Sequence, residues 1–197
     1  MTADSVRPGA DRGPEPPRPR PATWRFMGLH PLRLLALGLG SGLSPIAPGT
    51  AGTLAGWALF LLLDRWLTPL DWAAVLVAGL LVGWWACTQT ARAMAIADPG
   101  AIVWDEILAF WLILWIIMPV GLLGQAIAFG LFRAFDAVKR GPVGWADGCF
   151  KSRAGAAPGW AQGFGILFDD LVAALCTLVV FAGGQWTWQW IGLKVAR

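Results

Sequence analysis

The sequence predicts an all-α fold, a polytopic membrane helix bundle with about four or five transmembrane helices and a short N-terminal interfacial helix. Of the 197 residues, 57% are hydrophobic and only 14% are charged, about half the charge of a soluble domain. The apolar residues form long stretches separated by Gly, Pro and short charged patches. Tryptophan occurs fourteen times and tyrosine never, and Trp186, Trp188 and Trp190 suit the membrane–water boundary that tryptophan favours.

The chain divides into a polar tail and one membrane domain. Residues 1–25 hold six prolines and five arginines with no apolar core, which predicts a disordered cytoplasmic tail. Residues 26–197 form the predicted membrane-embedded domain. Because arginine is concentrated ahead of the apolar region, the positive-inside rule places the N-terminus in the cytoplasm.

The apolar segments can be taken in order along the chain. Residues 29–40 are too short to span a bilayer and should lie at the interface or pack against the bundle. Five further segments approach the roughly 20 residues that a crossing needs, the first of them marginally. They are residues 51–67, 72–91, 101–120, 121–138 and 163–184. Residues 143–163 are expected to form a loop.

Alternating the direction of these segments brings the polar groups to one side of the membrane. They are the segment 44–52, Gln89 and Arg92, Asp105 and Glu106, Asp136 and Lys139, and Asp169 and Asp170. Most flanking basic residues fall on the same side, namely Arg133, Lys139, Arg140, Lys151 and Arg153, whereas Lys194 and Arg197 do not. The pattern therefore predicts a site that faces the cytoplasm.

Carboxylates within apolar helices indicate a metal site. Each costs about 2.5 to 3.5 kcal/mol on insertion scales, so Asp105-Glu106 and Asp169-Asp170 need compensation. Magnesium prefers oxygen ligands of this kind; the alternative is a protonated carboxylate without metal, as in transporters. Adjacent residues on a helix point about 100° apart, so one member of each pair can support the site indirectly.

Basic residues near the fourth segment suit a phosphate. Arg133, Asp136, Lys139 and Arg140 share one helical face at steps of three and four. Lysine offers phosphate a point charge and arginine a fork of donors, while Asp136 would orient them or bind metal. The simpler alternative is a set of structural ion pairs.

The stretch SGLSPIAPGTAGTLAG introduces an apolar helix through a constrained turn. Thr50 or Thr53 could cap this helix and leave backbone N–H groups free for an anion. The alternative is an ordinary helix entry. Cys87, Cys149 and Cys176 lack metal-ligand spacing, and His30 is the single histidine, so nucleophilic catalysis by cysteine or histidine is not expected.

Several motifs together resemble the phosphatidylglycerophosphatase A family. They are GSGLSPIAPGTAGTLAG (40–56), QTARAM (89–94), DPGAIVWDEILAFW (98–111), FRAFDAVK (132–139) and GFGILFDDLVAA (163–174). The resemblance implies an all-helical, magnesium-dependent lipid phosphatase of the bacterial inner membrane. Such an enzyme removes the terminal phosphate from phosphatidylglycerophosphate and yields phosphatidylglycerol for glycerophospholipid biosynthesis. The sequence departs from the family's Lys-Pro-x-Pro, which reads Lys139-Arg140-Gly141-Pro142 here and so loses the first proline, and in a longer 143–163 segment.

The resemblance also implies the site residues. Asp98, Asp105, Glu106, Asp136, Lys139, Asp169 and Asp170 match its polar motif positions, and Ser44, Pro48, Gly49 and Thr50 match its N-terminal loop. We expect Asp105, Glu106, Asp169, Asp170 and Asp98 to hold Mg²⁺, one ion or two.

In the expected reaction, metal-activated water attacks the phosphate monoester. Asp136 or Glu106 would serve as general base, and Lys139 and Arg133 would stabilise phosphoryl charge; an aspartyl-phosphate intermediate stays open. The rival interpretation is a small ion-coupled transporter, but transporter carboxylates tend to lie near the bilayer midplane. The expected partners are phosphatidylglycerophosphate and membrane lipids, not nucleic acid.

Overall fold

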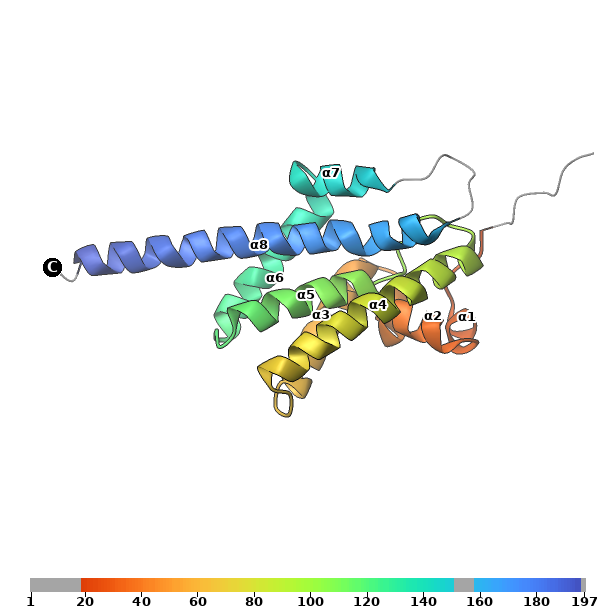
Figure 1. Cartoon of the computed structure of the whole chain (residues 1–197), viewed down its shortest axis with the longest axis horizontal. Helices are drawn as coiled ribbons and strands as arrows, with labels where there is room; N and C mark the ends of the chain where they lie inside the picture. The colour runs from red at the N-terminus through yellow and green to blue at the C-terminus, as the bar shows by residue number, and fades with distance from the viewer. Residues whose placement is uncertain (1–18, 151–157, 196–197) are drawn as a thin grey trace, which may run out of the picture.

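The computed structural model describes residues 19–150 and 158–195, with side chains as far as Trp190. These residues form helices and no strands, which confirms the predicted all-α class. Figure 1 shows the long α8 lying across α5 and α6, with α1 and α2 near its N-terminal end. The elements are α1 (Trp24–Gly28), α2 (Pro31–Ala36), the 3₁₀ helix η1 (Gly38–Leu43), α3 (Pro48–Leu63), α4 (Pro69–Met94), α5 (Trp104–Ile117), α6 (Leu122–Val138), α7 (Pro142–Cys149) and α8 (Trp160–Val195).

Proline and capping residues set where several helices begin. Proline opens α2, α3, α4 and α7, a position where its missing N–H costs nothing. At the start of α4, Thr68 Oγ1 accepts from the backbone N–H of Asp71 at 3.3 Å, and Asp71 Oδ2 accepts from the Thr68 N–H at 2.9 Å. This reciprocal box satisfies two N–H groups that a helix start would otherwise leave unpaired.

The start of α3 differs from the prediction. Its cap position is Ala47, in the left-handed region with φ of 47°, and no described side chain caps the helix. Thr53 instead donates its hydroxyl to the Gly49 carbonyl at 2.8 Å. The prediction that Thr50 or Thr53 could cap α3 is therefore wrong, because the helix begins at Pro48, before either threonine, and its cap position is Ala47.

Helix α5 is the centre of the packing. It contacts α3, α4 and α8, and Phe110, Ile113 and Leu114 are fully buried. Trp111 donates its indole N–H to the Gly56 carbonyl of α3 at 2.7 Å. A Cβ at Gly56 would lie 3.1 Å from the Ile107 side chain, so glycine lets α3 and α5 approach closely.

Two of the described helices, α4 and α8, are long and apolar enough to cross a membrane. The 16, 14 and 17 residues of α3, α5 and α6 reach about 21 to 26 Å at 1.5 Å per residue, less than the roughly 30 Å hydrocarbon core. The predicted four or five crossings are thus not confirmed. Helix α5 is shorter than the predicted segment 101–120 because it begins only at Trp104 and ends before Pro119 and Gly121, which lie in the turn to α6.

The N-terminal apolar segment holds short helices only. Helix α2 packs against α4, and the Val103 N–H donates to the Ala36 carbonyl at 3.0 Å. Ahead of it, α1 begins at Trp24, and the Arg20 N–H donates to the Met94 carbonyl at 2.8 Å. The rest of the predicted tail, residues 1–18, lies outside the described residues.

The predicted loop 143–163 contains a helix. Helix α7 covers Pro142–Cys149 and packs against α8, so the prediction of a loop is wrong over these residues. Its eight residues are mixed in polarity and too few to show a clear period; burial of Val143 and Ala146 against the bundle stabilises it. Lys151, Arg153 and Arg197 fall outside the described residues, as does the side chain of Lys194.

Candidate active site

Helix ends from distant parts of the chain meet on one side of the bundle. The start of α5 and the N-terminal part of α8 lie near the end of α4, at the right of Figure 1. Helix α5 contacts α3 and α8, and α8 also contacts α4, α6 and α7. The polar residues of the sequence motifs are carried by these elements.

Asp105, Glu106 and Asp170 form an acidic cluster. One ligand oxygen from each lies within 4.8 Å of the others. Asp105 and Glu106 occupy the first turn of α5, where the helix dipole favours negative charge, and no described side chain caps that turn. Asp170 projects from α8 and is only 3% exposed.

The acidic cluster has the properties of a cation site. Glu106 Oε2 and Asp170 Oδ2 are buried, and neither has a hydrogen-bond partner among the described residues. A buried carboxylate oxygen without a partner is costly, and a cation would satisfy both. The donors are all oxygen, the kind that magnesium prefers. The residues therefore fit a magnesium ion.

Arg133 lies beside the acidic cluster. Its Nη1 is 2.6 Å from Asp136 Oδ2, one turn further along α6, and 3.8 Å from Glu106 Oε1. Its Nε is buried without a described hydrogen-bond partner. A Cβ at Gly49, in the first turn of α3, would overlap Glu106 Oε1 and lie 3.0 Å from Arg133 Nη2. Glycine at this position therefore brings the α3 backbone against the Glu106–Arg133 pair.

Lys139 joins two other carboxylates. Its Nζ is 2.6 Å from Asp169 Oδ2 and 3.0 Å from Asp147 Oδ1. Partial burial lowers the pKa of Lys139, but the hydrogen bonds and charges of Asp169 and Asp147 outweigh that effect and raise the pKa well above its ordinary value. The lysine is therefore a stable cation. It follows α6 directly, in the left-handed region with φ of 43°.

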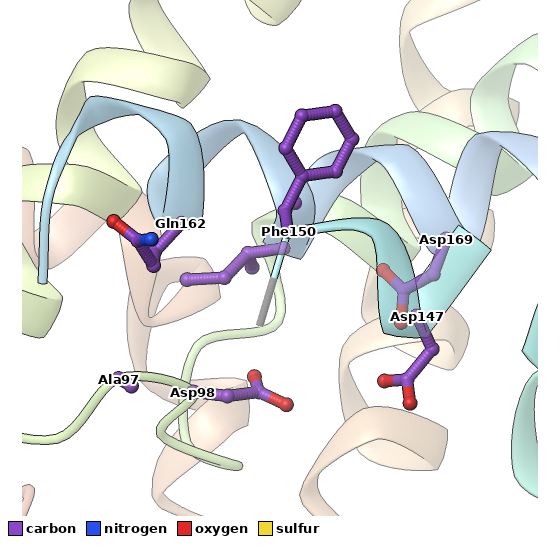
Figure 2. Close-up of a pocket in the computed structure, with 8 residues that line it drawn as sticks. Ala97, Asp98, Asp147, Phe150, Gln162 and Asp169 are labelled. Carbon is purple, nitrogen blue, oxygen red and sulfur yellow. The ribbon is translucent and has the colours of Figure 1, made fainter. Parts of the chain in front are cut away.

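A polar cavity of about 250 Å³ opens next to this ion pair. Figure 2 shows Asp98, Asp147 and Asp169 on one part of its wall and Gln162 on another, with Phe150 between them. Asp98 comes from the segment between α4 and α5, Asp147 from α7, and Asp169 and Gln162 from α8. We call this space the polar cavity.

The structure separates the neighbouring aspartates of α8. Asp170 belongs to the acidic cluster, whereas Asp169 faces Lys139 and the polar cavity. The expected metal set of Asp105, Glu106, Asp169, Asp170 and Asp98 is thus divided between two neighbouring places. Asp136 pairs with Arg133 and lies close enough to Asp170 for their charges to interact.

The predicted N-terminal loop reaches the site through one residue. Gly49 contacts it, and Pro48 opens α3. Ser44 donates its hydroxyl to the Ile46 carbonyl at 2.8 Å and so shapes the turn. Thr50 follows in the first turn of α3 and is half-buried.

Two residues near the site were not proposed from the sequence. Asp147 lies in the segment expected to be a loop, and only its place in a WADG stretch after Lys139 could have drawn attention to it. Cys87 was interpreted as a structural cysteine. It is fully buried in α4, close enough to Glu106 and Asp170 to feel their charges.

Acidic side chains outnumber basic ones at the site. Arg133 and Lys139 are its described ion-pairing cations. The carboxylates are Asp98, Asp105, Glu106, Asp136, Asp147, Asp169 and Asp170. Such an excess suits a bound cation, and the two basic groups beside it suit a phosphate.

Several known proteins are similar to this chain. The family model Phosphatidylglycerophosphatase A matches residues 34–184. The chain is 36% identical over 162 residues to the protein named Phosphatidylglycerophosphatase A from Escherichia coli (strain K12), covering 80% of this chain and 86% of that protein. It is also 36% identical over 159 residues to the Haemophilus influenzae protein of the same name, covering 80% and 91%.

A third relative carries a different name. A Bacteroides thetaiotaomicron protein, provisionally named a phosphatidylinositol-3-phosphatase, is 32% identical over 169 residues, covering 78% of this chain and 92% of that protein. No solved structure gives a significant match to the chain.

Proposed function

The chain belongs to the phosphatidylglycerophosphatase A family, and we propose that it hydrolyses the terminal phosphate monoester of phosphatidylglycerophosphate with the help of magnesium. The products are phosphatidylglycerol and inorganic phosphate. The observation that carries this proposal is the acidic cluster of Asp105, Glu106 and Asp170, with ligand atoms within 4.8 Å, beside the guanidinium of Arg133. A cation site next to an arginine suits a phosphate ester.

Asp105, Asp170 and one oxygen of Glu106 would hold the metal. When bound, magnesium supplies a Lewis acid that withdraws charge from the phosphoryl oxygens. Asp98 and Asp169 line the polar cavity and do not belong to the acidic cluster, so they would not be ligands of that ion. The second half of the α8 pair, Asp169, instead holds Lys139 in place.

Arg133 is the best-placed group for the phosphate. Asp136 fixes its guanidinium at 2.6 Å, and the backbone at Gly49 lies against it. A guanidinium held in this way presents fixed N–H donors to phosphoryl oxygens without further reorganisation. Lys139 adds a second fixed positive charge at the edge of the polar cavity.

Glu106 is the better candidate for general base. With Oε2 on the metal, its Oε1 would stay free to take a proton, because it lies 3.8 Å from Arg133 Nη1, beyond hydrogen-bond distance, whereas Asp136 Oδ2 is engaged by Arg133 at 2.6 Å. The base accepts a proton from the attacking water as the new P–O bond forms. The bond between phosphorus and the glycerol oxygen breaks, and that oxygen takes a proton from surrounding water to leave as an alcohol, while Glu106 returns its proton to water.

We further propose that the protein is a multi-pass protein of the bacterial inner membrane with its site toward the cytoplasm. Helices α4 and α8 support membrane insertion, and the exposed Trp186, Trp188 and Trp190 near the end of α8 suit a membrane boundary. Asp170 lies toward the opposite, N-terminal end of α8, so the acidic cluster would face the other membrane boundary, where a lipid phosphate can reach it. The transporter interpretation is not supported, since the matched relatives are named as phosphatases.

Phosphate release by the purified protein tests the proposal. In mixed micelles, phosphatidylglycerophosphate should be hydrolysed with magnesium and not with excess EDTA, and magnesium should restore activity after chelation. Phosphatidylinositol 3-phosphate serves as a second substrate, because one relative bears that name. Full activity in EDTA would exclude the metal role.

A matched pair of amide variants localises the chemistry. Asp105→Asn should lower turnover by about a hundredfold, the usual effect of losing a strong electrostatic contact. Asp71→Asn makes the same change in the first turn of α4, the end of that helix away from the site. Asp71 belongs to the capping box there, so this variant should keep normal turnover. Equal losses in both variants would point to general instability instead of a local site.

A further inference from the structure

A second cavity, lined only by apolar side chains, lies between α4, α5 and α8. Its volume is about 230 Å³. Leu76 and Leu80 of α4 line it, with Leu108, Leu112 and Trp115 of α5 and Leu171 of α8. We call it the apolar groove. No polar group along it could bind a headgroup.

The apolar groove continues the face of α5 that carries the acidic cluster. Asp105, Leu108, Leu112 and Trp115 follow one another at steps of three and four residues, which places them on the same face of the helix. Ten residues separate Asp105 from Trp115, about 15 Å along the axis at 1.5 Å per residue. The groove thus starts about one turn below the acidic cluster and runs away from it.

Helix α4 gives the same direction, and α8 places the groove beside the acidic cluster. Along α4, the lining residues Leu76 and Leu80 precede Gly83 and Cys87 at helical steps, and Cys87 lies within reach of the Glu106 and Asp170 charges. On α8, Leu171 directly follows Asp170. The α4 and α5 walls of the groove therefore lead to the acidic cluster at one end, and the single α8 residue Leu171 lies at the level of Asp170.

The opposite end is bounded by Trp115. Its indole N–H donates to the carbonyl of Pro69, the first residue of α4, at 3.1 Å. This bond connects α5 to the start of α4 and fixes the ring in the lining. The groove consequently has a defined length as well as a defined starting point.

We propose that the apolar groove binds an acyl chain of the lipid whose phosphate is hydrolysed. This inference rests on the proposed function, because that substrate carries its acyl chains and its phosphate in one molecule. A space of about 230 Å³ is too narrow for a partner helix and is open along its length, as Val77 is 60% exposed. A chain that leaves the bilayer for the groove keeps apolar surroundings and gains packing contacts, so the groove both retains the lipid and aligns its phosphate with the acidic cluster.

Groove-filling variants test the proposal. Val77→Trp fills the middle of the groove from a largely exposed position, and Ala73→Phe fills it near Trp115. The measured quantity is the ratio of kcat/KM for dioleoyl to that for dihexanoyl phosphatidylglycerophosphate in the same mixed micelles. The ratio should fall at least tenfold for Val77→Trp and about threefold for Ala73→Phe.

The control fills a different apolar space. Gly184→Leu adds volume to the cavity of about 600 Å³ between α6 and α8, where a new Cβ at residue 184 meets nothing within 4 Å. Its ratio should equal that of the unchanged protein, and all three variants should melt within a few degrees of it. An unchanged ratio in Val77→Trp, or an equal fall in the control, would overturn the inference.

Binding gives a second readout that does not require turnover. Native mass spectrometry with EDTA present compares retention of the two phosphatidylglycerophosphates by the unchanged protein and by Val77→Trp. If Val77→Trp retains less of the dioleoyl lipid than the unchanged protein but as much of the dihexanoyl lipid, the apolar groove is supported as the binding site. If both proteins retain the dioleoyl lipid equally, the inference is overturned. Failure of the proposed function would show differently, as absence of phosphate release from either lipid by the unchanged protein.

Discussion

The two adjacent aspartates of α8 should respond in opposite ways to the same substitution. Asp170 is buried in the acidic cluster with an unpaired Oδ2, whereas Asp169 holds Lys139 at 2.6 Å. Changing either one to asparagine keeps the shape of the side chain and removes its charge. Because the positions are neighbours on one helix, differences in the outcome report on their partners.

The magnitude for Asp170 follows from the spacing within the acidic cluster. Two full charges no more than 4.8 Å apart repel by at least about 3.5 kcal/mol at an effective dielectric constant of about 20. Proton uptake by the metal-free protein relieves part of this repulsion. Asp170→Asn should therefore leave the metal-free protein equally stable or more stable by about 0.5 to 2 kcal/mol, the usual range of stabilising changes. Its turnover at saturating magnesium should fall by about a hundredfold.

For Asp169→Asn the expected change in stability has the opposite sign, so the metal-free protein should become less stable. Asparagine there removes one of the two carboxylates that pair with Lys139. The free energy of unfolding should fall by about 1 to 2 kcal/mol. This is less than for a fully buried ion pair, because the Lys139 side chain is 35% exposed and water screens the interaction. Melting temperatures in one detergent with EDTA, together with phosphate release, measure both effects. Marked destabilisation of Asp170→Asn with normal turnover would refute the reasoning.

Three further predictions concern the surroundings of the site. Gly49→Ala should lower turnover at least tenfold, because its Cβ would overlap Glu106 Oε1. The control is Gly100→Ala, where a Cβ meets nothing within 4 Å. Equal turnover in the two variants would contradict the close approach of Gly49 to the site. The ion-pair stability from Lys139 is fully present below the ordinary lysine pKa and is lost only as pH rises through the raised value. The difference in melting temperature between the unchanged protein and Lys139→Met should consequently be the same at pH 7 and pH 9, and a difference that shrinks by pH 9 would count against the pair. Deleting residues 1–18, which are rich in proline and arginine, should leave phosphate release in detergent within about twofold, whereas a large fall in a well-folded truncation would show that the tail takes part.

The helical class and the main helices could be predicted from the sequence because they depend on local properties. Long apolar stretches favour helices that satisfy their own backbone groups, and proline and glycine interrupt them at definite places. Helix α4 accordingly contains the predicted segment 72–91, and α6 begins within one residue of the prediction. The same local reasoning failed for α7, whose eight residues are stabilised by contacts with α8 instead of by their own pattern.

The sequence also identified the candidate site residues, since carboxylates in apolar helices need a compensating partner wherever they lie. Only the tertiary structure decided how they are divided. Asp169 and Asp170 are neighbours in the chain, yet a rotation of about 100° per residue turns Asp170 toward Asp105 and Glu106 and turns Asp169 toward Lys139 and Asp147. Which of two adjacent side chains meets which partner depends on how α5, α6, α7 and α8 pack together, and that packing joins residues far apart in sequence.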